Sequence, residues 1–153
     1  PKGTKGHRGH VPDYFCRLGN GDGLVVDVKR PDKVEANAQQ FAMTREVCEQ
    51  VGWKYKVFTG LPEPRLSNVT FLCGFRQDRY SPGAENVAAL IDAFTPGTSL
   101  EAGVRRAVRA TGRPRPVVHG NVLHLLWNGV LAVDLDGPLD LSSLVAVATA
   151  VAA

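Results

Sequence analysis

The chain has 153 residues, 44% of them hydrophobic and 22% charged, and a formal net charge of +3 at pH 7. This composition is ordinary for a soluble globular protein of one domain or two small ones, and the modest charge permits nucleic-acid binding without requiring it. No run of about 18 apolar residues occurs and no signal peptide is visible, so we expect a protein without a membrane span.

The chain begins with a short basic segment rich in glycine, residues 2–9. Three of its side chains are candidates for contacts with DNA phosphates: Lys2, Lys5 and Arg8. The alternative is a solvated terminus that leads into the first strand. His7 and His10 do not suggest a metal pair, because no cysteine or third histidine lies near them in the sequence.

A β-hairpin is predicted next, with strands at 10–18 and 24–30. The segment Asn20-Gly21-Asp22-Gly23 joins them, and Asn-Gly and Asp-Gly favour tight hairpin turns because glycine readily adopts a positive φ. We expect the turn to be centred between Gly21 and Asp22. This choice fixes the register of the two strands.

The register decides which side chains meet. It places Asp13 opposite Lys29 or its neighbour, with Asp27 diagonal to Asp13. Because side chains alternate along a strand, Val25 shares one face with Asp27 and Lys29. We therefore expect two carboxylates and an amine on the same face of the hairpin.

The opposite face of the second strand is apolar and consists of Leu24, Val26 and Val28. We expect a helix at 34–51, predicted from its apolar spacing and stopped by Gly52, to cover this face. A strand at 53–59 follows, and because a helix connects it to the sheet it should run parallel to its neighbour. Trp53 and Tyr55 could stack on bases, although packing on the sheet is the commoner use.

Asp13, Asp27 and Lys29 together predict a metal-dependent nuclease site. Carboxylate, water and phosphate oxygens are the ligands that Mg²⁺ prefers. A metal held there would polarise a scissile phosphate and activate a water, and the lysine could orient that water or offset charge on the phosphate. The alternative is an ordinary exposed hairpin face with salt bridges.

A proline-rich linker is predicted at 61–64. The apolar segment 66–75 follows as a candidate helix, and the polar segment 76–83 then interrupts the chain. We place the domain boundary at this interruption. The result is a nuclease-like core at 1–80 and a second domain at 81–153.

The second domain is predicted to contain three helices followed by a pair of strands. The helices lie at 84–94, 98–110 and 117–128, with Thr98 or Ser99 as a cap and Gly112 as a stop for the second. A strand at 130–135 follows them and ends in a turn at 136–138. Three short helices and a strand pair are typical of a winged-helix-like domain.

The densest basic cluster lies at the end of the second of these helices and just beyond it. Its candidates for neutralising DNA phosphates are Arg105, Arg109 and Arg113. The alternative is a solvated, arginine-rich helix face. The third helix is nearly all apolar, which argues against base reading in the major groove and favours a structural helix or one that docks a protein partner.

The three cysteines are Cys16, Cys48 and Cys73. They are odd in number, widely spaced and without a CxxC pair. We therefore expect small buried residues in a reducing cytoplasm rather than a disulfide framework or a zinc site.

The pattern Pro12-Asp13…Asp27-Val28-Lys29, followed by a helix and a strand, resembles the core of PD-(D/E)xK nucleases. More narrowly, the chain is similar to the TnsA-like endonuclease subunits of heteromeric transposases, in particular the short actinobacterial type. The similar stretches are HVPDYFCRL, LVVDVKRPDK, VCEQVGWKYKVFTG, LSNVTFLCGFR and HLLWNGVLAVDLDGPL. Together they span most of residues 10–140.

The resemblance implies an enzyme, a Mg²⁺- or Mn²⁺-dependent DNA endonuclease that cuts at a transposon end. Asp13 and Asp27 would be catalytic metal ligands, Val28 would add its backbone carbonyl, and Lys29 would be the catalytic lysine. The partners would be DNA, a transposase subunit and an ATPase regulator, and the chain could also form a homodimer. Such a protein works in the cytoplasm, associated with the nucleoid. The second domain would resemble the family's winged-helix-like C-terminal module, which contacts partner proteins and DNA.

The family core begins with a helix that carries a glutamate of the metal site, followed by a further strand. Nothing before Pro12 supplies either, so we expect an α/β core without its first helix and strand. Two rival functions stay open. One is a non-catalytic DNA-binding or adaptor protein on a nuclease-like scaffold, and the other is a nuclease of restriction or repair type with the same chemistry.

Overall fold

The computed structural model describes residues 10–148, which form two units that divide between Gly60 and Leu61. Each unit contains helices and strands, so the protein belongs to the mixed α/β class. Over the described range, none of the helices has both the length and the apolar character needed to cross a membrane. The candidate DNA contacts Lys2, Lys5 and Arg8 lie outside the described residues.

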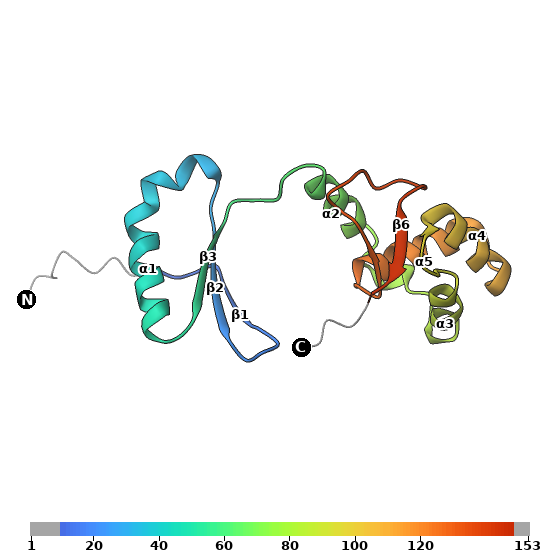
Figure 1. Cartoon of the computed structure of the whole chain (residues 1–153), viewed down its shortest axis with the longest axis horizontal. Helices are drawn as coiled ribbons and strands as arrows, with labels where there is room; N and C mark the ends of the chain where they lie inside the picture. The colour runs from blue at the N-terminus through green and yellow to red at the C-terminus, as the bar shows by residue number, and fades with distance from the viewer. Residues whose placement is uncertain (1–9, 149–153) are drawn as a thin grey trace, which may run out of the picture. The chain divides into compact units, whose positions relative to one another are not determined.

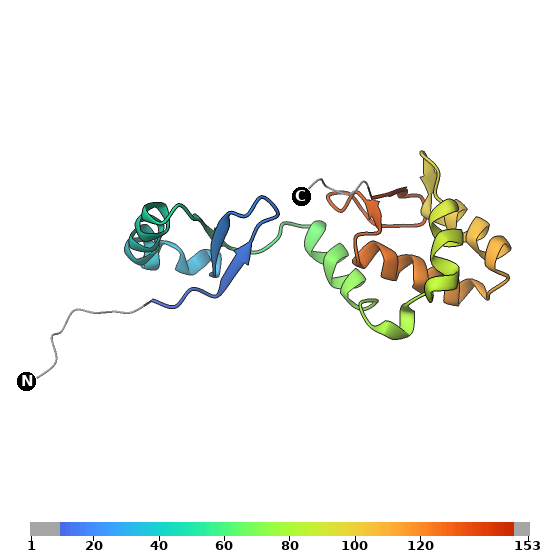
Figure 2. The same ribbon diagram turned by 90° about the horizontal axis from the view of Figure 1, so that it is seen from below.

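The first unit is a three-stranded sheet with a helix along one side (Figures 1 and 2). β1 (Tyr14–Arg17) pairs antiparallel with β2 (Gly23–Val28), and β2 pairs parallel with β3 (Lys54–Phe58). The predicted order of strand, strand, helix and strand is confirmed. So is the parallel direction of the last strand.

The hairpin register differs from the predicted one. Tyr14 lies opposite Val26. One step further along the two strands, Asp13 is therefore level with Asp27, whereas the prediction placed Asp13 opposite Lys29. The correction keeps Asp13 and Asp27 on one face and brings them closer together.

The loop of the hairpin explains the shift. The Leu18 N–H donates to the Asp22 carbonyl oxygen, and the Gly21 N–H donates to the Leu18 carbonyl oxygen, both at 2.9 Å. Gly21 adopts the positive φ of 88° that only glycine takes without strain. The hairpin is thus centred on Asn20, before the Gly21–Asp22 step on which the prediction was centred.

The helix of the first unit covers the opposite sheet face from the predicted one. This helix is α1 (Ala38–Gln50), and two short 3-10 turns, η1 (Pro31–Lys33) and η2 (Glu35–Asn37), lead into it. In β2, Val25 is 5% exposed and Asp27 is 1% exposed, whereas Val28 is 45% exposed. Val25 and Cys48 of α1 line the same cavity, so α1 covers the face of Val25 and Asp27.

The sequence could not show which face of the sheet α1 covers, because β2 carries apolar side chains on both of its faces. A charged residue on one of the two faces favoured the other as the buried one. The structure instead buries the charge and supplies it with hydrogen-bond partners.

The second unit combines helices with a small antiparallel sheet. Its helices are α2 (Arg65–Cys73), the 3-10 turn η3 (Asp78–Tyr80), α3 (Ala84–Asp92), α4 (Leu100–Thr111) and α5 (Arg115–Trp127). Its strands are β4 (Thr98–Ser99), β5 (Leu131–Val133) and β6 (Leu144–Val147), paired in the order β4–β6–β5. The predicted three helices and terminal strand pair are present, and β4 adds a third strand.

The ends of α4 follow the sequence signals. The Ser99 side-chain oxygen accepts a hydrogen bond from the Ala102 N–H at 3.3 Å, as an N-cap does. Gly112 ends the helix in the left-handed conformation, with a φ of 65°. Both predictions are confirmed.

The division between the units lies earlier than the boundary predicted at residue 80. The Asn68 side-chain amide in α2 donates to the carbonyl oxygens of Leu135 and Gly137, at 2.9 and 2.8 Å. Leu72 of α2 belongs to the buried cluster of the second unit. α2 is therefore part of the second unit, and the polar break after it is an internal loop.

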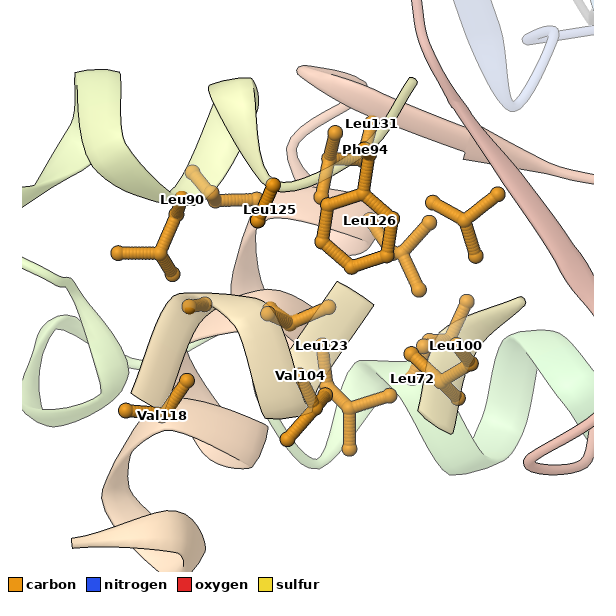
Figure 3. Packing of buried hydrophobic residues seen from close by; sticks show 14 residues of the cluster. Leu72, Leu90, Phe94, Leu100, Val104, Val118, Leu123, Leu125, Leu126 and Leu131 are labelled. Carbon is orange, nitrogen blue, oxygen red and sulfur yellow. The ribbon is translucent and has the colours of Figure 1, made fainter. Parts of the chain in front are cut away.

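α5 lies at the centre of the second unit. From Val118 to Leu126 every residue except His119 is buried. Figure 3 shows Val118, Leu123, Leu125 and Leu126 of this helix beside Leu90, Phe94, Leu100 and Val104 in one apolar cluster. The prediction that this helix is structural is confirmed.

The cysteines meet the expectation only in part. Cys48 is buried and Cys73 is partly buried, but Cys16 is exposed. All three are free thiols in this structure. Cys16 lies on β1, an edge strand with four exposed residues, so the sheet cannot bury it.

Candidate metal centre

The hairpin brings the two predicted carboxylates together. Asp13 Oδ2 accepts a hydrogen bond from the Val28 N–H at 2.7 Å. The backbone N–H of Asp13 in turn lies close enough to the Asp27 carboxylate to lower its pKa. Asp13 is thus tied to the end of β2, next to Asp27.

Asp27 is buried, and its two carboxylate oxygens have different surroundings. Oδ2 accepts hydrogen bonds from His10 Nε2, at 2.7 Å, and from the Tyr55 hydroxyl. Oδ1 is buried as well but has no hydrogen-bond partner among residues 10–148. Burial raises the pKa of the Asp27 carboxyl, but the hydrogen bonds from Tyr55 and His10, with a small contribution from the nearby Asp13 backbone, outweigh it and hold the pKa below its usual value.

The neighbours of Asp27 stay protonated. Burial, and then the hydrogen bond to Asp27, raise the pKa of the Tyr55 hydroxyl, which therefore remains a donor. Burial and the negative charge of Asp27 also raise the pKa of the Cys48 thiol. The Tyr55 hydroxyl and the Cys48 thiol are thus neutral neighbours of the ionised carboxylate.

Val28 and Lys29 follow Asp27 at the end of β2. The Lys29 N–H donates to the Phe58 carbonyl oxygen at 3.0 Å, which extends the pairing with β3 beyond the last residue of β2. Lys29 is half-buried. It lies two positions after Asp27, so the alternation of a strand places both on one face.

The available donors suit a divalent cation in type but do not form a finished cage. The unpaired Oδ1 of Asp27 and the second oxygen of Asp13 are hard ligands of the kind that Mg²⁺ and Mn²⁺ prefer. Among residues 10–148, no three His, Cys, Asp or Glu side chains converge on one point. The Val28 carbonyl, water and a substrate phosphate would have to complete the coordination.

Two grooves open beside the cluster, and His10 lines both of them. One has a volume of about 570 Å³ and carries the polar side chains Asn37, Gln39 and Gln40. The other has a volume of about 410 Å³ and is mainly apolar, with Val25, Val47 and Trp53 in its walls. His10 is therefore the residue that connects Asp27 to the surface of the unit.

The arginine candidates of the second unit fall into two groups. Arg105 and Arg109 are exposed and lie one turn apart on α4. Arg113 is partly buried, and its Nη1 donates to the Pro82 carbonyl oxygen at 3.3 Å. Arg105 and Arg109 are thus available for phosphate contacts, whereas Arg113 stabilises the fold.

Sequence reasoning missed His10 and Tyr55 as partners of Asp27. It considered His10 only as a metal ligand with His7, and Tyr55 only as a stacking or packing residue. The sequence predicted a parallel strand here, but only the register seen in the structure, which pairs Val25 with Tyr55, puts Tyr55 on the face of Asp27.

No protein-family model and no curated protein matches the chain.

Proposed function

We propose that the chain is a metal-dependent DNA endonuclease subunit that cuts phosphodiester bonds at transposon ends together with a partner transposase. The observation that carries the proposal is the proximity of Asp13 and Asp27, which the hydrogen bond from the Val28 N–H to Asp13 fixes. One buried carboxylate oxygen of Asp27 has no hydrogen-bond partner among residues 10–148. The resemblance to TnsA-like subunits supplies the biological setting. It adds an ATPase regulator as a further partner and places the work at the nucleoid.

The proposed roles follow from the chemistry of each group. Asp13 and Asp27 hold the cation through their free oxygens, and the Val28 backbone carbonyl assists them. A Mg²⁺ or Mn²⁺ ion in this position supplies Lewis acidity toward the phosphate and toward a bound water. Lys29 orients that water or offsets the charge that builds on the phosphate.

The proposal assigns the first unit to a PD-(D/E)xK nuclease core without its first helix and strand. In support, β1, β2, α1 and β3 occur in the expected order, with the aspartates on the central strand and just before the edge strand. It assigns the second unit to a winged-helix-like domain. There α3, β4, α4, α5, β5 and β6 follow one another, and the strands form one antiparallel sheet.

Arg105 and Arg109 are the proposed DNA contacts of the second unit. Replacing both with alanine should weaken DNA binding and reduce the slope of log affinity against log salt by about 2, because each phosphate contact contributes about 0.9. Arg76→Ala, another exposed arginine of this unit, is the matched control and should leave the slope unchanged. An unchanged slope in the double variant would exclude α4 from the DNA contact.

The decisive test is metal-dependent cleavage of transposon-end DNA by the full chain with its partner transposase. Asp13→Ala, Asp27→Ala and Asp27→Asn should each abolish cleavage, with the folded state checked by circular dichroism. Asp32→Ala is the control, because Asp32 is an exposed carboxylate of η1 whose ion pairs among residues 10–148 are with its neighbours Arg30 and Lys33. Cleavage at the wild-type rate by the Asp13 or Asp27 variants would refute the proposal.

A second candidate function is a non-catalytic DNA-binding adaptor on the same scaffold. The burial of Asp27 favours it, as does the absence of three converging metal ligands among residues 10–148. Calorimetric titration with Mg²⁺ and Mn²⁺ separates the two functions. Binding that depends on Asp27 supports the nuclease, and no binding supports the adaptor.

A further inference from the structure

The unequal surroundings of the two Asp27 oxygens call for a physical explanation. Leaving a buried carboxylate oxygen unpaired is costly, and such atoms are rare in folded proteins. Yet Oδ2 receives two hydrogen bonds, while the buried Oδ1 receives none from the part of the chain that the structure describes. The fold therefore concentrates donors on one oxygen and keeps the other free.

The two donors come from different parts of the first unit and fix the carboxylate from separate directions. His10 precedes β1, and Tyr55 lies in the middle of β3, on the far side of the central strand. The Arg45 guanidinium of α1 lies over the Tyr55 ring, 5.7 Å from its centre. Tyr55 is thus held between the sheet and the helix, and its hydroxyl has a defined position.

The direction of the His10 hydrogen bond follows from the acceptor that the ring faces. An ionised carboxylate oxygen can only accept, so His10 Nε2 carries a hydrogen and donates it to Asp27. The Tyr55 hydroxyl donates to the same oxygen. Two donors on Oδ2 leave Oδ1 as the oxygen with unused acceptor capacity.

We infer that His10 and Tyr55 are positioning residues, which clamp Oδ2 of Asp27 so that Oδ1 is the single oxygen presented to the divalent cation. The inference rests on the proposed metal-dependent function and assigns two residues to it that the nuclease pattern does not contain. Groups that bind the second atom of a metal ligand orient the ligand and strengthen its hold on the metal. In this site, the clamp makes Asp27 a monodentate ligand.

A buried water is a weaker explanation for the free oxygen. An ordered interior water needs two to four polar partners. The buried neighbours of Asp27 offer few such partners: Val25, on the same face of β2, is apolar, and the nearby Cys48 thiol is a weak donor. A cation that approaches from the Asp13 side would satisfy Oδ1 with a second carboxylate already in place.

The experiment is a calorimetric titration of the full chain with Mn²⁺, without DNA. Tyr55→Phe removes only the hydroxyl and His10→Ala removes the second donor. Each should weaken Mn²⁺ binding about 10-fold, and the double variant about 100-fold. His10→Gln keeps an N–H donor and should recover much of the loss.

The matched control is Tyr14→Phe, since Tyr14 is an exposed tyrosine of β1 whose hydroxyl makes no hydrogen bond with residues 10–148. It should bind Mn²⁺ as the wild type does. In an Asp27→Asn background, Tyr55→Phe should have no further effect on Mn²⁺ binding, because the clamp acts only through Asp27. Thermal unfolding of the same samples shows whether each variant is folded.

The outcomes are distinct. Wild-type affinity in folded Tyr55→Phe and His10→Ala overturns the inference alone and leaves the metal-dependent function standing, since the clamp would then only stabilise the fold. No Mn²⁺ binding by the wild-type chain overturns the proposed function and the inference with it. Reduced affinity in both variants, with recovery in His10→Gln, supports the clamp.

Discussion

The two units of this protein bury different kinds of side chain. In the second unit, residues 61–148, the interior is a continuous apolar cluster around α5. In the first, residues 10–60, the buried apolar side chains are few, namely Val25, Phe41 and Cys48, and the most buried side chain is the carboxylate of Asp27. The second unit is thus organised by apolar burial, and the first is organised around a polar site.

The first unit also leaves many large apolar side chains in contact with solvent. They are Val11, Tyr14, Phe15, Val28, Met43, Val47, Val51 and Trp53. A small domain with little apolar burial has little stability to spare. The first unit therefore combines little apolar burial with a buried, hydrogen-bonded charge.

The largest expected effect follows from truncating the core of the second unit. Leu123 is 1% exposed at the centre of α5, so Leu123→Ala should lower the free energy of unfolding of this unit by about 2–5 kcal/mol. Denaturant unfolding should show the loss in the second unit and leave the first unchanged. Leu144→Ala, at a leucine that is 63% exposed on β6, is the control. An equal loss in both units would show that they unfold as one, and would refute the view that each unit is stabilised by its own interior.

A smaller effect is expected from overfilling the same core. Gly103 of α4 faces the ring of Phe94, and a Cβ built at Gly103 would lie 2.0 Å from the nearest ring atom. The Gly103→Ala variant should therefore lose about 1–3 kcal/mol of unfolding free energy, despite the better helix propensity of alanine.

The control for this prediction is a second-site change. Phe94→Leu should relieve the clash, so the double variant should lose less than the two single variants together when all are compared by chemical denaturation. Strict additivity would mean that the Phe94 ring does not set the size of residue 103.

The same contrast explains what the sequence could and could not predict. Helix ends and turns depend on local chemistry, so Ser99 and Gly112 were assigned correctly at both ends of α4. The side of the sheet that α1 covers depends on tertiary packing, and the run of apolar residues in β2 is compatible with either side. The unit boundary failed for a similar reason, because α2 joins the second unit through its contacts with α5 and with the loop after β5.

The candidate site was half predictable. The spacing of Asp13 and Asp27 about a glycine-rich turn was enough to bring the two carboxylates together, even with the register two or three residues in error. The partners of Asp27 were out of reach, because Tyr55 is 28 residues away and is aligned only by the parallel pairing of β2 and β3. A buried charge depends on such distant partners, whereas an apolar core depends on a pattern that the sequence displays.

The smallest expected effect concerns acid stability, and it should separate the two units by their interiors. The pKa of Asp27 is lowered in the folded state, so its hydrogen bonds stabilise the first unit above the unfolded pKa of about 3.9. This stabilisation should be lost as the pH falls through the still lower folded pKa. Burial opposes the hydrogen bonds, so the loss should be modest. Asp27→Asn should flatten this part of the stability profile of the first unit and leave the profile of the second unchanged, as measured by thermal unfolding between about pH 2 and pH 6. If the wild-type and Asp27→Asn profiles of the first unit run parallel below pH 4, protonation of Asp27 is not what destabilises this unit in acid.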